Sequence, residues 1–256
     1  MTQTLHLDIG GGIARLRIDR PARRNAMNQS MWQAFPGLVD EAMANPAVRL
    51  LIVESAHAGA FCAGADIAEF ALSSADPDWR KANNTAIHAT QSTLRHAPKP
   101  TLAAIDGDCI GGGCVIALAC DMRIASPRAR FGVTPAKLGL VYPFDDTKAL
   151  VDLVGPGQAR RLLYTAMLVD AAEALRIGLV EQVADDLNVA VAAHAAAILA
   201  TSGHTQRATK KIVARILAGD TDAERSTAGQ FDSAFEGSDF TEGVAAFLAK
   251  RPAEFR

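Results

Sequence analysis

Several features that mark other classes of protein are missing from this sequence. The longest apolar runs, residues 50–53 and 114–120, are bounded by charge or glycine and fall far short of the ~20 residues that cross a bilayer. The N-terminus lacks the basic start and long apolar segment of a secretion signal. No block of basic residues is suited to a phosphate backbone. We therefore expect a cytoplasmic protein that binds neither membrane nor nucleic acid.

Cysteine is also scarce, and its spacing argues against a metal centre. The four cysteines stand at residues 62, 109, 114 and 120, with no CxxC pair and no histidine spaced to complete a zinc site. A free cysteine behaves as a small hydrophobic residue. We expect reduced, mostly buried thiols and no bound metal.

The pattern that is present indicates an α/β core followed by helices. Of the 256 residues, 49% are hydrophobic, which is enough to bury a sizeable core. Apolar runs of strand length alternate with helical patterns before about residue 145, and this order is typical of crossover connections. The predicted strands are residues 13–18, 50–53, 101–105 and 122–125, and the predicted helices between them are 30–44, interrupted at Pro36, 79–97 and 113–119. The tail is predicted to be helical at 171–177, 187–200, 205–217, 223–235 and 240–250.

Two glycine-bearing loops are the candidate site. Residues 111–113 (GGG) follow a predicted strand and open a predicted helix, whose first N–H groups are unpaired and carry partial positive charge. Residues 61–67 (FCAGADI) also follow a strand and present a glycine beside small residues. Together the loops could supply one N–H each to a developing oxyanion, although tight helix packing alone would also explain the glycines. The glycines at 10–12 are instead predicted to form a hairpin turn.

Motifs along nearly the whole chain resemble those of one family. They are RPARRNAMN (20–28), FCAGADI (61–67), IDGDCIGGGCVIALACDMRIA (105–125), ARFGVTPAKLGL (129–140), DAAEALRIGLV (170–180) and EGVAAFLAKRPAEF (242–255). In this order the segments are similar to the crotonase, or enoyl-CoA hydratase/isomerase, family.

The resemblance implies a fold and an assembly. We expect a ββα spiral core over residues 1–195 with the acyl-CoA site, and a helical region over residues 196–256 for oligomerisation and CoA contact. Members of the family form trimers, often paired into hexamers, so a homotrimer or a dimer of trimers is expected.

The resemblance also implies site residues. The two N–H groups that stabilise a thioester enolate fall on Ala65 and Gly112. The residues implied in CoA binding are Arg24, Ala26, Ala63, Ala65, Asp66, Ile67 and Lys250. For Asp66, a role in capping its own loop is an equal alternative, because aspartate readily accepts hydrogen bonds from nearby backbone N–H groups. CoA enters as part of the substrate, so no separate cofactor is expected.

The sequence departs from the family's hydratases at two positions. Aligned without gaps, the two glutamates that manage water in hydratases are replaced by Val115 and Pro135, and neither residue can carry a proton. An oxyanion hole without that pair suits decarboxylation of a malonyl-type CoA ester, in which loss of carbon dioxide itself creates the enolate. Two alternatives are enoyl-CoA hydration or isomerisation by other residues, and a non-catalytic acyl-CoA-binding subunit.

The segment around Tyr142 is the last candidate. Residues 134–142 (TPAKLGLVY) resemble the family's methylmalonyl-CoA decarboxylases, which implies that Tyr142 lies near the acyl group. Those enzymes carry histidine where this chain has Ala65, so a packed or surface tyrosine is the alternative. Asp145 and Asp146 are predicted to cap the following helix, and a carboxylate reaching the acyl pocket is the competing interpretation.

Overall fold

Two sheets of mainly parallel strands form the body of the protein. The computed structural model describes residues 4–222 and 226–255. The larger sheet consists, in chain order, of β1 (Leu5–Gly10), β2 (Ile13–Ile18), β3 (Leu50–Ser55), β5 (Thr101–Ile105), β7 (Met122–Ala125) and β10 (Gln182–Val183). These strands lie side by side in that order, with β1 antiparallel to β2 and every later neighbour parallel. The four predicted strands are confirmed, as is the hairpin turn between β1 and β2.

A second, smaller sheet lies beyond the ends of the first. It contains β4 (Ala60–Cys62), β6 (Asp108–Ile110), β8 (Arg130–Gly132) and β9 (Leu168–Asp170), in that order. Each has only three residues, which is too short for an alternating pattern to predict. Long strand, short strand and helix repeat along the chain, as in β5, β6 and the helix that follows. The predicted ββα core is therefore confirmed.

Ten α-helices are described, and they surround the sheets and extend beyond them. They are α1 (Gln29–Ala44), α2 (Ile67–Ser73), α3 (Pro77–Arg95), α4 (Gly112–Ala119), α5 (Phe144–Thr165), α6 (Ala171–Arg176), α7 (Leu187–Leu199), α8 (Gly203–Leu217), α9 (Ser226–Ala234) and α10 (Ser238–Ala249). Short 3-10 turns lie at Pro21–Arg23 and Pro135–Leu138. The sequence patterns did not predict α2, and the helix expected after Asp146 is α5, which begins at Phe144. The predicted helix at 223–235 has its first three residues outside the described part of the chain.

The prediction that Pro36 interrupts the first helix is wrong. Helix α1 continues through Pro36 from residue 29 to residue 44. On either side of the proline, Phe35 and Val39 are fully buried in the main core. Tertiary packing of these side chains offsets the backbone hydrogen bond that proline cannot make.

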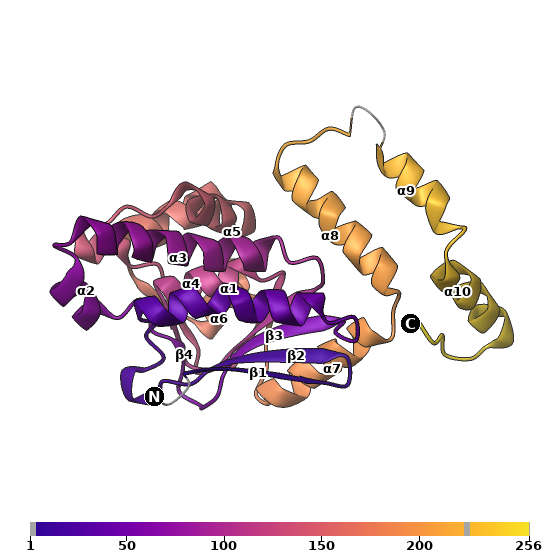
Figure 1. Cartoon of the computed structure of the whole chain (residues 1–256), viewed down its shortest axis with the longest axis horizontal. Coiled ribbons are helices and arrows are strands. Elements are labelled where there is room, and N and C mark those ends of the chain that lie inside the picture. The colour runs from indigo at the N-terminus through magenta and orange to yellow at the C-terminus, as the bar shows by residue number, and fades with distance from the viewer. Residues whose placement is uncertain (1–3, 223–225, 256) are drawn as a thin grey trace.

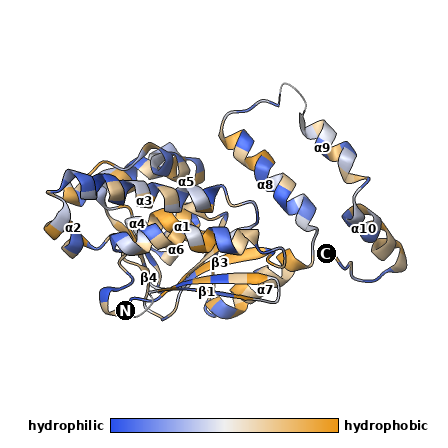
Figure 2. Ribbon diagram, viewed as in Figure 1, coloured by the Kyte–Doolittle hydropathy of each residue, from blue (hydrophilic) through white to orange (hydrophobic). Residues whose placement is uncertain are grey.

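Two apolar layers enclose the larger sheet. One face packs against α1, α4 and α5 in the main core, and the other packs against α7 through side chains such as Ile52 and Leu102. Figure 2 shows this apolar character on β3, α4 and α7. All four cysteines are buried and form no disulfide, which confirms the expectation of buried thiols.

The last three helices stand away from the body. Helices α8, α9 and α10 project to one side in Figure 1, beyond α7. Residue 195, the predicted end of the core, lies within α7, and the projecting helices begin at Gly203. Among the described residues, no helix is long and apolar enough to cross a membrane.

Candidate active site

The two glycine-bearing loops meet directly. A Cβ placed on Gly64 would lie 2.9 Å from the Ile110 carbonyl oxygen and 3.2 Å from the Gly112 nitrogen. Gly64 also has a φ of 97°, which side chains rarely adopt. A Cβ on Gly113 would lie 2.1 Å from the Cys62 carbonyl oxygen. Glycine is therefore required on both loops for their backbones to approach so closely.

This contact brings the two predicted N–H donors together. A Cβ on Gly112 would lie 3.5 Å from the Ala65 nitrogen, so the two backbones are neighbours. Gly112 is the first residue of α4, and its N-cap, Gly111, offers no side chain to accept from it. Within residues 4–222 and 226–255, neither the Ala65 N–H nor the Gly112 N–H donates a hydrogen bond. Both donors are available for a ligand oxygen, and binding of that oxygen stays a prediction.

The first loop is held by the segment that precedes α1. The Ala63 N–H donates to the Arg24 carbonyl at 3.0 Å, and the Met27 N–H donates to the Gly64 carbonyl at 2.7 Å. Arg24 adopts a left-handed conformation, and its guanidinium pairs with Asp108 while remaining 61% exposed. The structure thus brings the predicted CoA-binding positions Arg24 and Ala63 into contact. Ala26 lies between Arg24 and Met27 in the sequence of the same segment.

Asp66 has a defined structural role. Its carboxylate caps α2 by accepting from the Ala68 N–H at 3.0 Å, and it pairs with Arg20 at 2.7 Å. Burial acts to raise the pKa of Asp66, but the hydrogen bonds from Arg20 and from the backbone outweigh it and lower the pKa. The capping role is therefore confirmed, and a ligand contact by Asp66 stays a prediction. The neighbouring Ile67 is half exposed at 50%.

Lys250 does not join the other predicted residues within one chain. It follows the end of α10, whereas Ile67 opens α2. These two helices lie at opposite ends of the molecule (Figure 1). Its predicted CoA contact stays a prediction that the arrangement of a single chain does not support.

The two positions where the resemblance implies glutamates in hydratases are apolar in this chain. Val115 is 3% exposed and lies three residues after Gly112 on α4. Pro135 opens the 3-10 turn that follows β8. Neither side chain can exchange a proton with a substrate.

Tyr142 points into the protein. Its hydroxyl is buried and makes no hydrogen bond to any residue that the structure describes. Burial, with Cys114 and Asp146 nearby, raises the pKa of Tyr142 well above its ordinary value. The hydroxyl is therefore a neutral group close to the start of α4.

The prediction that Asp145 and Asp146 cap the next helix is wrong. Helix α5 begins at Phe144 after Pro143, with no side-chain cap, so both aspartates lie in its first turn. Asp145 is 49% exposed and lies 3.6 Å from the His88 imidazole, whereas Asp146 is 1% exposed. The sequence analysis did not predict which of the two aspartates is buried, although the i, i+4 spacing of Asp146 to the buried Leu150 places both on one helix face.

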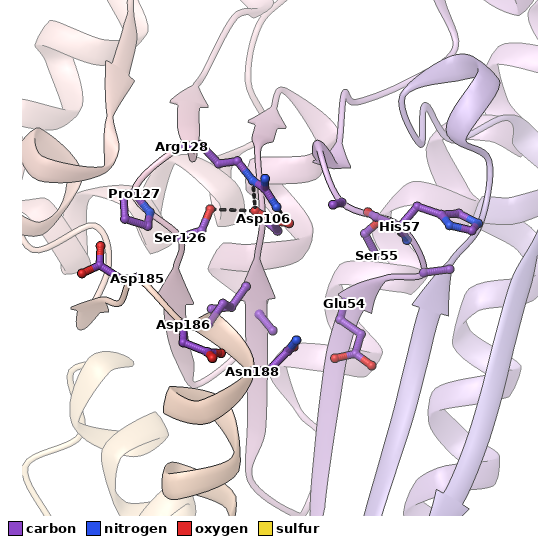
Figure 3. A pocket seen from close by; sticks show the side chains of 14 residues that line it. Glu54, Ser55, His57, Asp106, Ser126, Pro127, Arg128, Asp185, Asp186 and Asn188 are labelled. Carbon is purple, nitrogen blue, oxygen red and sulfur yellow. Dashed lines mark hydrogen bonds and ion pairs between the residues drawn. The ribbon is translucent and has the colours of Figure 1, made fainter.

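A separate hollow of about 590 Å³ lies at the carboxyl ends of β3, β5 and β7. Figure 3 shows Ser126 and Arg128 meeting at Asp106, with the Ser126 hydroxyl donating to Asp106 at 2.7 Å and Arg128 paired with the same carboxylate. None of the predicted site residues lines it. In the described part of the chain, no group of histidine, cysteine, aspartate or glutamate side chains is placed to hold a metal.

The sequence and the fold are similar to those of known proteins. The Enoyl-CoA hydratase/isomerase family matches residues 8–256. Crotonyl-CoA hydratase of Syntrophomonas wolfei is 37% identical over 247 residues, covering 95% of this chain and 94% of the relative. Mitochondrial methylglutaconyl-CoA hydratase of Mus musculus is 31% identical over 255 residues, covering 96% and 80%. The crystal structure of a putative enoyl-CoA hydratase/isomerase family protein from Hyphomonas neptunium superposes with a TM-score of 0.96 at 42% identity, covering 100% and 98%.

The chain belongs to the enoyl-CoA hydratase/isomerase, or crotonase, family. It is an acyl-CoA enzyme of that family.

Proposed function

We propose that the protein binds an acyl-CoA thioester and stabilises its enolate between the Ala65 and Gly112 N–H groups. The observation that supports this function is the adjacency of two backbone donors without partners among the described residues. Donors that are fixed before the reaction stabilise a developing oxyanion without reorganisation. The rim formed by Arg24, Ala26, Ala63, Asp66 and Ile67 binds the CoA portion, and no further cofactor takes part.

Two reactions of such an enolate are candidates. Decarboxylation of a malonyl-type ester is favoured by Val115 and Pro135, because no base is needed to create the enolate. An apolar wall at Val115 also withholds solvation from the departing carboxylate, and Tyr142 would orient that group. Hydration of an enoyl ester is favoured by the buried carboxyl of Asp146, because this group can ionise whereas Val115 and Pro135 cannot.

Subunit assembly completes the proposal. We expect a homotrimer or a dimer of trimers in which Lys250 of one subunit contacts the CoA bound to another. The exposed apolar side chains Phe247 and Leu248, 83% and 76% exposed, support burial of α10 against a second copy.

The test is mass spectrometry of crotonyl-, malonyl-, methylmalonyl- and branched enoyl-CoA after incubation with the purified protein. Gain of water identifies hydration, and loss of carbon dioxide identifies decarboxylation. Tight binding of the esters without any turnover would contradict the proposal and indicate a binding subunit.

A further inference from the structure

One aromatic side chain of α1 packs against the start of α4. A Cβ placed on Gly112 would lie 3.0 Å from Cζ2 and 3.2 Å from Cη2 of Trp32, so the far edge of the indole ring contacts the Gly112 backbone directly. The Ala65 nitrogen lies 3.5 Å from the same Cβ position. The edge of the indole therefore lies beside the two predicted donors.

The residues just before Trp32 hold the other loop through their backbone. The Met27 N–H donates to the Gly64 carbonyl at 2.7 Å, and the Met27 carbonyl accepts from the Asp66 N–H at 2.9 Å. Ala65, between these two hydrogen bonds, pairs with Met27 in a parallel bridge. One short stretch of chain thus contacts both loops, the first through Met27 and the second through Trp32.

Trp32 is itself held firmly in the first turn of α1. The Asn28 side chain caps this helix by accepting from the Met31 N–H at 3.0 Å, and the Asn28 carbonyl accepts from the Trp32 N–H at 3.1 Å. On the neighbouring helix α3, the Thr90 hydroxyl donates to the Trp32 carbonyl at 3.0 Å. The tryptophan is 1% exposed. Its ring therefore offers the Gly112 backbone a fixed surface.

The ring also separates Gly112 from a hollow. Trp32 lines a hollow of about 490 Å³ between α1 and α3, and none of the other residues that line it belongs to either glycine-bearing loop. A shorter side chain at this position would leave the Gly112 backbone facing unfilled space. The indole Nε1 is buried and makes no hydrogen bond to any described residue, which is destabilising and which an apolar core residue would avoid. Stability alone therefore does not explain a tryptophan here, whereas its reach to Gly112 does.

We propose that Trp32 is a positioning residue that fixes the Gly112 N–H at the distance from the Ala65 N–H that one enolate oxygen requires. The inference rests on the proposed enolate site. Donors stabilise an oxyanion best when they are fixed before the reaction, and a displacement of about 1 Å can lower the rate by about 10²-fold. At 1% exposure the ring is not available to the CoA portion. Shortening it should therefore lower kcat and leave KM nearly unchanged.

The test measures kcat and KM of the full-length protein with crotonyl-CoA and methylmalonyl-CoA, one probe for each candidate reaction. Trp32→Phe shortens the ring at the edge that meets Gly112, so kcat should fall by about 10-fold while KM stays within about twofold of the wild type. Val39→Ala is the matched control, because Val39 is fully buried on α1 about two turns beyond Trp32. It should lower stability and leave kcat within about twofold of the wild type.

A double variant separates positioning from loss of structure. Gly112→Ala adds a Cβ 3.0 Å from the indole ring, so it should lower kcat when Trp32 is present. In the Trp32→Phe background the added methyl group fills the space that the shorter ring leaves. The double variant should then be more active than either single variant, whereas independent structural damage would make the two losses multiply.

A binding measurement keeps the test informative if Trp32→Phe folds poorly. Trp79→Phe leaves Trp32 as the only tryptophan, and its fluorescence emission should change as unreactive butyryl-CoA saturates the site. Three results overturn this inference and leave the enolate site standing: wild-type kcat in Trp32→Phe, multiplied losses in the double variant, or constant emission while calorimetry shows butyryl-CoA bound. Neither turnover nor binding of any CoA ester overturns both proposals.

Discussion

At the scale of single residues, the site is defined by what particular positions lack. The residues at 64, 112 and 113 lack side chains, which allows the two loops to touch. Val115 and Pro135 lack carboxyl groups, and Asp146 lacks contact with solvent, since it is 1% exposed. The first two features could be predicted from the sequence because they follow motifs. The third could not, because two adjacent aspartates in one helical turn differ only in which of them faces the core.

Asp146→Asn should stabilise the fold, and the gain should depend on pH. The folded-state pKa of about 6 lies above the ordinary 3.8, so between these values the folded protein binds the proton more tightly. In the wild type, stability therefore falls as pH rises from about 4 to about 6. The variant has no carboxyl to ionise at this position. Its gain over the wild type in the free energy of unfolding should therefore reach up to about 3 kcal/mol at pH 8 and be small at pH 4.

Urea unfolding of both proteins at the two pH values measures this difference in stability. An equal gain at pH 4 and pH 8 would contradict the assignment of a raised pKa to Asp146. Asp145→Asn serves as the control, since its side chain is half exposed.

At the scale of elements, replacing a glycine of the two loops and replacing an exposed glycine elsewhere should have opposite effects on the free energy of unfolding. Gly113→Ala places a Cβ 2.1 Å from the Cys62 carbonyl, so the α4 backbone must move. We expect a loss of about 1–3 kcal/mol in the free energy of unfolding. Gly37→Ala, at an exposed position of helix α1 with nothing within 4 Å of the new Cβ, should instead gain about 0.5–1 kcal/mol. Chemical denaturation of the two variants checks both signs, and a neutral Gly113→Ala would contradict the close approach of the loops.

Most elements with a strong local pattern could be predicted, and the others depend on tertiary contacts. Strand β3 is a continuous apolar run, and α7 and α8 were predicted to within two residues. Helix α5 was expected only as a helix that follows Asp146, and its length was not predicted because Gly155, with a φ of 75°, and Pro156 divide its pattern. Helix α2 has only seven residues, which is too short for a helical pattern to predict.

At the scale of the whole molecule, the projecting helices expose side chains that a monomer would bury. Phe231, Phe247 and Leu248 are 67%, 83% and 76% exposed on α9 and α10. The division between body and projecting helices could be anticipated because β-type patterns stop before it. The direction in which the helices project could not, because local sequence patterns do not describe the arrangement of helices that lie far apart.

The protein should elute as a species of three or six times the 27.0 kDa chain mass. Phe247→Glu should lower that mass, because it places a charge on the expected interface. Leu72→Glu, at an 86% exposed site on α2 at the other end of the molecule, should leave it unchanged. Light scattering after size exclusion measures both, and a monomeric wild type would contradict the assembly.

The central claim is that a backbone N–H on Gly112 stabilises an enolate, and one pair of variants tests it most directly. Gly112→Pro deletes this donor at the first position of α4, where a helix tolerates proline. Gly112→Ala adds a Cβ at the same place and keeps the N–H, so it controls for the contact with Trp32. On the best CoA ester, kcat of the proline variant should be about 10²- to 10³-fold below that of the alanine variant. Equal activity of the two folded variants would contradict the account.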